Sequence, residues 1–181
     1  MASPPNISTV SAQAIGISSF RSAGGATTGY ASVAWLAANF ITVIPFRLDF
    51  PFVVRRLFWY NGATVGTDGA SVGVYDETAT KLLVTCANTT TSGTNAIQSV
   101  AATTTTPLFP GNYYLAFGAS GTTTTVFMTA SNTLPRIQAL GCLEQQSGYS
   151  SGLPTAPTFV APALAGFLRI PLYGISQGSV I

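Results

Sequence analysis

Histidine is absent from this chain of 181 residues, so the usual base of nucleophilic triads and the commonest metal ligand are both missing. The two cysteines, Cys86 and Cys142, do not form a metal-ligand pattern. A disulfide between them is one alternative. We expect two buried free thiols instead, because nothing else in the sequence indicates an oxidising compartment. We expect no metal and no cofactor.

Charged side chains are also scarce, at 7% of the residues against about 25% in ordinary globular proteins. Soluble surfaces usually carry mixed charge that resists association. Thr, Ser, Asn and Gly must therefore supply most of the polar surface, and we expect other chains to cover part of the exterior. The alternative is a Thr/Ser-rich extracellular β protein.

The net charge of +2 is too small and too scattered for a nucleic-acid partner. Arg55-Arg56 is the only basic pair in the sequence, and on a strand its two side chains point to opposite faces. The sequence therefore contains no phosphate-binding stripe.

Neither residues 1–10 nor the apolar runs indicate a signal or a membrane-spanning segment. Residues 1–10 lack the basic and apolar regions of a secretory signal. The longest apolar run, residues 31–46, is too short to span a bilayer, and we interpret it as a buried passage from loop to strand. Residues 1–30 have the composition of an extended N-terminal arm that lies on neighbouring chains. Residues 31–181 are expected to form a single domain.

The clearest secondary-structure pattern begins at residues 52–60, which are β-branched and aromatic and predict a strand. Asn61-Gly62 then suits a turn with positive φ. Residues 71–76 alternate with a period of two, residues 76–79 form a turn, and residues 81–85 return as a partner strand. This succession predicts an antiparallel meander.

The rest of the chain predicts further strands, with a long Gly/Ser/Pro loop at residues 144–157. Residues 113–117 and 122–130 are expected to pair as a hairpin. About eight strands with irregular connections favour an all-β fold, an antiparallel β-sandwich that is jelly-roll-like, over an up-and-down barrel. The additional strands are expected at residues 40–50, 97–106, 113–117, 122–130, 132–143 and 167–175.

Two charged side chains, Arg47 and Asp49, lie two residues apart and therefore on one face of a predicted strand. They are expected to form an ion pair. Arg55 or Arg56 could join this cluster from the next strand.

The acidic residues are not arranged for catalysis. Asp76 and Glu77 are adjacent in a turn, where their side chains diverge, so a glycosidase pair is not expected there. Asp68, in the segment G-T-D-G, offers one carboxylate, which alone makes a weak calcium site. We therefore expect that the chain is not an enzyme.

Two aromatic pairs, Trp59-Tyr60 and Tyr113-Tyr114, are candidates for contact with a carbohydrate or a partner chain. On a strand, one ring of each pair points inward and the other outward. The outward ring either packs under a loop or against a neighbouring subunit, or it stacks on a sugar.

Several motifs in succession carry a resemblance to a known group of proteins. They are P-F-R-L at 45–48, V-R-R-L-F-W-Y-N-G at 54–62, V-G-V-Y-D at 72–76 and L-F-P-G-N-Y-Y-L-A at 108–116. This order resembles tailed-bacteriophage virion proteins, which are jelly-roll or sandwich domains of capsid decoration, tail fibres and receptor-binding tips. The resemblance covers about residues 40–130. It implies a non-enzymatic virion component, assembled in the host cytoplasm and homotrimeric, and it carries over no catalytic residue.

Three hypotheses follow. The first is a capsid decoration or cement protein that stabilises the shell through contacts with copies of itself and with the major capsid protein; the absence of heptads for a fibre shaft favours it. The second is a tail-fibre or tail-tip protein that binds a host surface glycan through an outward Trp or Tyr. The third, a secreted cellular binding module, is disfavoured by the expected lack of a signal sequence.

Overall fold

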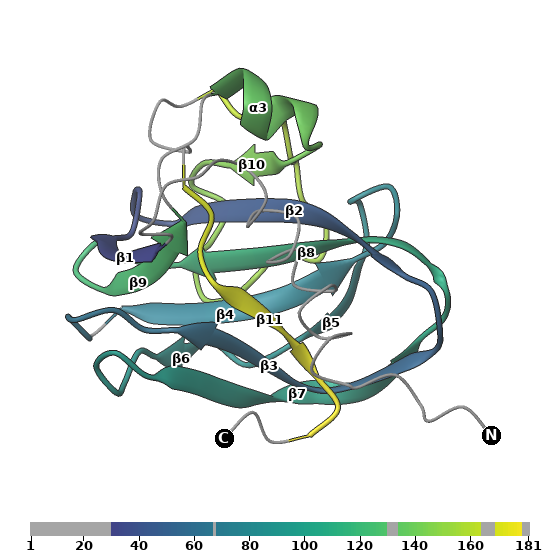
Figure 1. Ribbon diagram of the computed structural model, residues 1–181, viewed down its shortest axis with the longest axis horizontal. Coiled ribbons are helices and arrows are strands. Elements are labelled where there is room, and N and C mark those ends of the chain that lie inside the picture. The colour runs from purple at the N-terminus through teal and green to yellow at the C-terminus, as the bar shows by residue number, and fades with distance from the viewer. Residues whose placement is uncertain (1–29, 67, 130–133, 164–168, 179–181) are drawn as a thin grey trace.

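The computed structural model describes residues 30–66, 68–129, 134–163 and 169–178 (Figure 1). The expected N-terminal arm lies outside the described residues except for Tyr30. The described part contains eleven strands, where the sequence indicated about eight, and one helix. These elements are β1 (Tyr30–Ala34), β2 (Phe40–Leu48), β3 (Phe52–Tyr60), β4 (Gly69–Tyr75), β5 (Leu82–Thr85), β6 (Thr89–Thr90), β7 (Ile97–Leu108), β8 (Gly111–Ala119), β9 (Thr125–Thr129), α3 (Leu134–Ala139), β10 (Leu143–Gln145) and β11 (Tyr173–Ser176).

The strands form antiparallel sheets in two layers, which confirms the predicted all-β sandwich. The larger sheet has the order β10-β2-β8-β4-β5, and β6 pairs with β4. The second layer has the order β11-β3-β7. The β1-β9 pair joins this layer through two backbone hydrogen bonds, from Thr129 N to Ile170 O and from Leu172 N to Phe127 O, each 2.8 Å. Helix α3 and β10 lie together at the top of the view in Figure 1.

Strand pairing is nested around the hairpin between β4 and β5. Strand β2 pairs with β8, β3 with β7 and β4 with β5, so distant strands meet in pairs, as in a long hairpin that has been rolled up. The β4–β5 hairpin confirms the second half of the predicted meander. The first half is wrong, because β3 and β4 belong to different layers. The predicted hairpin at residues 113–130 is also wrong, since β9 pairs with β1.

Neither Asn61 nor Gly62 adopts the positive φ that the sequence predicted for a turn. These two residues are needed there for other reasons. Asn61 is buried and links three segments: its Oδ1 accepts a hydrogen bond from Trp59 Nε1 at 2.8 Å, and its Nδ2 donates to Gln98 Oε1 at 2.9 Å and to Ser92 O. A Cβ on Gly62 would lie 2.2 Å from Ser32 Oγ, so close packing requires glycine there.

The core between the layers is built around Phe117 on β8. Its ring centroid lies 4.8 Å from that of Trp35, 6.0 Å from Trp59 and 5.7 Å from Tyr173. All four side chains are fully or nearly fully buried. Such aromatic pairs contribute beyond the area that they bury, so this cluster ties β8 to β3 and β11 in the opposite layer.

A second hydrophobic cluster covers the outer face of the larger sheet. The segment that the sequence predicted as a loop, residues 144–157, begins with β10 and then lies against this face. The Tyr75 hydroxyl donates to Pro154 O and the Tyr149 hydroxyl to Asn88 Oδ1, both at 2.7 Å. This cover explains why both faces of β4 are buried. The buried members of the cluster are Ile41, Val43, Tyr75, Ala116, Tyr149 and Leu153.

Residues 134–139 form helix α3 instead of the strand predicted at 132–143, of which 132 and 133 lie outside the described residues. Pro135 fits the first turn of a helix, where an amide hydrogen has no intrahelical partner. Gly141, just past the end, has a φ of 71° that favours glycine. Ile137 is buried against the main core. Of the strand predicted at 167–175, residues 173–175 pair within β11, and Pro171 forms only an isolated bridge with Met128.

Both cysteines are buried free thiols, which confirms the expectation from sequence. Burial raises the pKa of Cys142 to about 12. Burial also raises the pKa of Cys86, and its contact with the Val72 carbonyl only partly offsets this effect. Within the described ranges, no helix has the length and hydropathy that a bilayer crossing requires.

Replacing Phe117 with alanine is expected to lower the free energy of unfolding by about 3–5 kcal/mol, because the substitution leaves a cavity among three aromatic rings. The matched control is Phe109→Ala, since Phe109 is 67% exposed and its loss should change stability by less than about 0.5 kcal/mol. Urea denaturation followed by tryptophan fluorescence measures both. Equal losses in the two variants would contradict the packing described.

Candidate functional site

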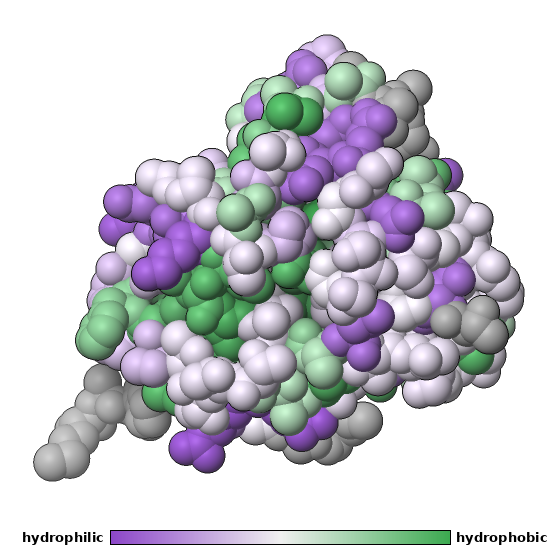
Figure 2. Space-filling model, turned by 180° about the vertical axis from the view of Figure 1, so that it is seen from behind, coloured by the Kyte–Doolittle hydropathy of each residue, from purple (hydrophilic) through white to green (hydrophobic). Residues whose placement is uncertain are grey.

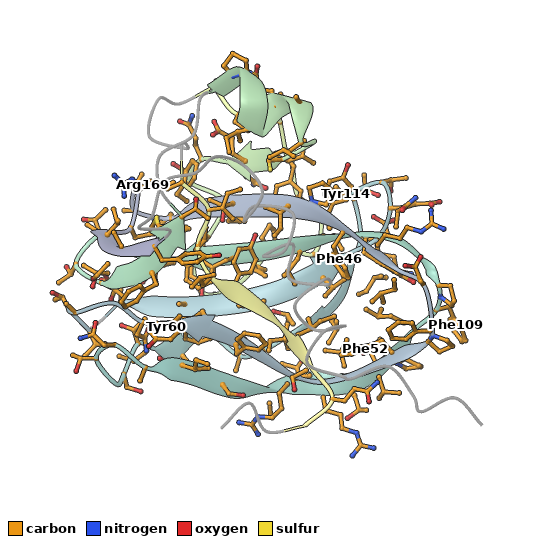
Figure 3. All side chains as sticks on the ribbon, viewed as in Figure 1. Phe46, Phe52, Tyr60, Phe109, Tyr114 and Arg169 are labelled. Carbon is orange, nitrogen blue, oxygen red and sulfur yellow. The ribbon has the colours of Figure 1, made fainter. Side chains whose placement is uncertain are left out.

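A groove of about 570 Å³ opens where β2, β8 and the turn after β4 meet. On one side, β8 pairs with β4 only as far as Tyr114, so residues 111–113 have no partner from β4. On its other side, β8 pairs with β2 through to Gly111. The groove lies beside the edge of β8 that β4 leaves unpaired. Figure 3 shows two of its residues, Phe46 on β2 and Tyr114 on β8. The lining residues are Pro45, Phe46, Arg47, Glu77, Thr78, Asn112, Tyr113 and Tyr114.

The β2–β8 pair forms the firm base of the groove, and aromatic side chains hold it on both faces. Phe46 and Tyr113 face each other across the β2–β8 pair, with ring centroids 5.7 Å apart and planes 31° apart. The Tyr113 hydroxyl donates to Phe109 O at 2.7 Å, which fixes this ring further. Tyr114 packs against the outer hydrophobic cluster and remains half-buried. The sequence correctly predicted that these two tyrosines point to opposite faces of their strand.

The predicted ion pair lies at the rim of the groove. Arg47 Nε is 2.9 Å from Asp49 Oδ1, and the two side chains are 73% and 72% exposed. A pair so exposed contributes about 0–1 kcal/mol to stability. It does, however, place equal and opposite charges beside the groove.

Arg55 and Arg56 lie elsewhere, on β3 in the other layer. Arg56 donates from Nε to Ser99 Oγ and from Nη2 to Ser99 O, both at 2.8 Å. Arg55 is exposed. Among the described residues the one salt bridge joins Arg47 and Asp49, so the four-residue cluster is not assembled.

Three polar groups in the groove make no hydrogen bond with any described part of the chain. They are the side-chain amide of Asn112, the Glu77 carboxylate and the Tyr114 hydroxyl. Thr78 differs, because its hydroxyl already donates to Asp76 Oδ2 at 2.9 Å. The free groups offer both donors and acceptors to a ligand.

Asp76 shapes the turn that carries Glu77 and Thr78. Its Oδ1 accepts hydrogen bonds from the backbone amides of Thr80 at 2.9 Å and Lys81 at 3.2 Å. Although partial burial raises the pKa of Asp76, these amides and the Thr78 hydroxyl outweigh that effect and hold the pKa below its usual range. The charged carboxylate therefore stabilises the turn.

The aromatic pair Trp59-Tyr60 does not belong to this groove. Trp59 is fully buried and cannot contact a ligand, which corrects its inclusion as a contact residue. Tyr60 is half-buried, packs edge-on against Phe127 with centroids 4.7 Å apart, and donates to Asn95 O at 3.0 Å. Figure 3 places Tyr60 and Tyr114 toward opposite ends of the molecule. The four aromatic residues therefore form no common surface.

Asp68 and Glu144, the remaining acids, are both buried. Asp68 Oδ2 accepts a hydrogen bond from Thr124 N at 2.8 Å, so this residue holds a loop where the sequence offered a weak calcium ligand. Glu144 Oε1 accepts from Ala163 N at 3.2 Å and from Gln146 Nε2 at 3.4 Å, while its Oε2 has no partner among the described residues. In the described part of the chain, no three acidic or cysteine side chains gather as metal ligands would.

Several groove residues escaped the sequence reasoning, namely Pro45, Phe46, Glu77, Thr78 and Asn112. The motifs P-F-R-L and P-G-N-Y-Y contain most of them. Only the pairing of β2 with β8 brings the two motifs together, and no local pattern reveals that pairing. No protein-family model matches the chain, and no curated protein matches it. The resemblance to virion proteins thus continues to rest on the quoted motifs.

Asp76→Asn is expected to lower stability near neutral pH and to have less effect in acid. A carboxyl with a lowered pKa contributes stability above its unfolded pKa of about 3.9, and this contribution is lost as pH falls through the folded pKa. Urea denaturation of both proteins on either side of that range measures the difference. Solvent screening keeps it below about 1 kcal/mol. A difference that does not change with pH would contradict this role of Asp76.

Glu144→Gln is expected to leave the free energy of unfolding unchanged or to raise it, because glutamine retains the acceptor for Ala163 N and removes a buried charge. Glu144→Ala should cost about 1–3 kcal/mol, since it leaves that amide without its acceptor. Thermal and urea denaturation compare the two variants. If glutamine proves as costly as alanine, the charge itself is required at this position.

Proposed function

We propose that the chain is a non-catalytic structural component of a bacteriophage virion. More specifically, we propose a capsid decoration protein. It would be a homotrimer that stabilises the shell through contacts with its own copies and with the major capsid protein. The observation that supports this proposal is the poverty of surface charge. Of only seven basic and five acidic residues, two acids, Asp68 and Glu144, are buried in the fold.

Exposed apolar surface supports the same proposal. Phe109 and Val160 are 67% and 55% exposed. Leu82, Leu143 and Phe159 only partly cover the outer hydrophobic cluster. Figure 2 shows hydrophobic residues open to solvent on the face seen from behind. Contiguous apolar surface of this kind is typical of protein–protein contacts.

A decoration protein of this type works through burial of surface. Each Å² of apolar surface removed from water contributes about 25 cal/mol before the costs of ordering are subtracted. The net gain for one contact is modest, and many copies on a shell add their contributions together. The exposed threonines of β7, residues 103–105, add hydrogen-bonding groups without charge.

Two further features support a virion domain. The nested pairs β2–β8, β3–β7 and β4–β5 are the arrangement that a jelly roll uses. The quoted motifs fall on strands β2, β3, β4 and β8 and on the turns beside them. The resemblance therefore rests on the framework of the sandwich and not on a catalytic site.

A second candidate function is that of a tail-fibre or tail-tip protein that binds a host surface glycan. The groove beside Tyr113 and Tyr114 favours it, because it combines the half-exposed ring of Tyr114 with free polar groups. Trp59 has no part in this candidate, since it is buried.

The number of copies per particle separates the two candidates. We expect quantitative mass spectrometry of purified parent particles to give on the order of hundreds of copies, scaled to the major capsid protein. A few dozen copies or fewer would favour the tail candidate. Absence of the chain from purified particles would contradict both.

A further inference from the structure

We propose that the groove beside Tyr113 and Tyr114 is a binding site for a neutral saccharide, namely the uncharged end of a glycan chain. This inference rests on the second candidate function and specifies its site and its ligand. It concerns the groove alone, so it does not require a particular position in a virion.

The dimensions of the groove suit a ligand of one or a few sugar units. Its volume of about 570 Å³ lies within the range of about 300–1,000 Å³ that small-molecule sites occupy. Most of its polar residues, including Arg47, Glu77 and Asn112, are exposed. A groove open to solvent in this way can accept the end of a chain whose remainder stays outside.

The Tyr114 side chain provides an apolar surface for the C–H face of a sugar ring. It lies on the same face of the sheet as the exposed Arg47 and Asn112, whereas Tyr113 packs against the main core on the opposite face. Tyr114 is held by the outer cluster, and part of its surface remains open. A ring that is already ordered loses little conformational entropy when a ligand packs on it.

The free polar groups match the hydroxyls of a sugar. The Asn112 amide both donates and accepts, the Glu77 carboxylate accepts, and the Tyr114 hydroxyl does either. Since none of them bonds to a described residue, a ligand would replace water at these groups without breaking an internal hydrogen bond.

The charges around the groove select against anionic ligands. Arg47 is the one basic residue in the lining, and Asp49 already pairs with it at 2.9 Å. Glu77 adds a second negative charge, so the two acids outweigh the one base. A phosphate or a sialic acid would meet net repulsion here. A neutral, hydroxyl-rich ligand would not.

Calorimetric titration of the full chain with lactose, maltohexaose and sialyllactose tests the proposal. We expect a neutral probe to bind, and sialyllactose to bind more weakly than lactose. Tyr114→Ala should weaken neutral binding by about tenfold or more. Asn112→Ala and Glu77→Gln alter exposed residues, so they test the groove even if Tyr114→Ala does not fold. Both should weaken lactose binding. Glu77→Gln should also reduce the ratio of lactose affinity to sialyllactose affinity.

The matched control is Tyr60→Ala, which removes another half-buried tyrosine at the opposite end of the molecule and should leave affinity unchanged. Titration with galactose separates two sources of the ligand. If lactose binds more tightly than galactose, the ligand is the end of a glycan chain. If the two bind equally, the groove is a saccharide site whose ligand is a free sugar.

Three results would overturn the proposal. If sialyllactose binds as tightly as lactose, the charge argument is wrong. If saccharide binding survives Tyr114→Ala and Asn112→Ala unchanged, the site lies elsewhere, while the glycan-binding candidate itself stands. If no neutral probe binds, both the groove assignment and that candidate fail.

Discussion

The packing of Phe117 between the two layers is the interaction on which the rest of the structure depends. Its contacts with Trp35, Trp59 and Tyr173 fix β8 in the middle of the larger sheet, with one face toward the core. The alternation of β8 then determines the remainder. Residue 116 faces the outer cluster, and Gly118 leaves room for Tyr149, whose ring would lie 2.4 Å from a Cβ at that position. The same strand carries Tyr113 and Tyr114 to the groove at its other end.

The scarcity of charge constrains how this fold meets its neighbours. Two of its five acids are used internally, as Asp68 holds Thr124 N and Glu144 holds Ala163 N. Hydroxyl groups take the place of charges elsewhere, for example in the 2.8 Å contact between Thr91 and Thr124. Hydroxyls satisfy buried and surface hydrogen bonds but supply no long-range repulsion between molecules. A surface of this kind is suited to close and lasting contact with neighbours.

Local patterns predicted where the strands lie in the sequence better than which strands pair with one another. Residues 52–60 became β3 with the predicted bounds, and Arg47 and Asp49 pair as their spacing indicated. Alternation tells which residues share a face, but not which strand lies beside them. That is why the layer change between β3 and β4 was missed. The sequence made Trp59 a candidate contact residue, because its burial depends on the opposite layer, which local patterns do not show. The groove was missed for the same reason, since β2 and β8 are distant in sequence.

We propose, above all, that copies of the same chain and a larger shell cover part of this sandwich. Multi-angle light scattering of the purified full chain over a range of concentrations tests it most directly. The account predicts a trimer, or a higher assembly that grows with concentration. A monodisperse monomer that stays soluble at every concentration would contradict it.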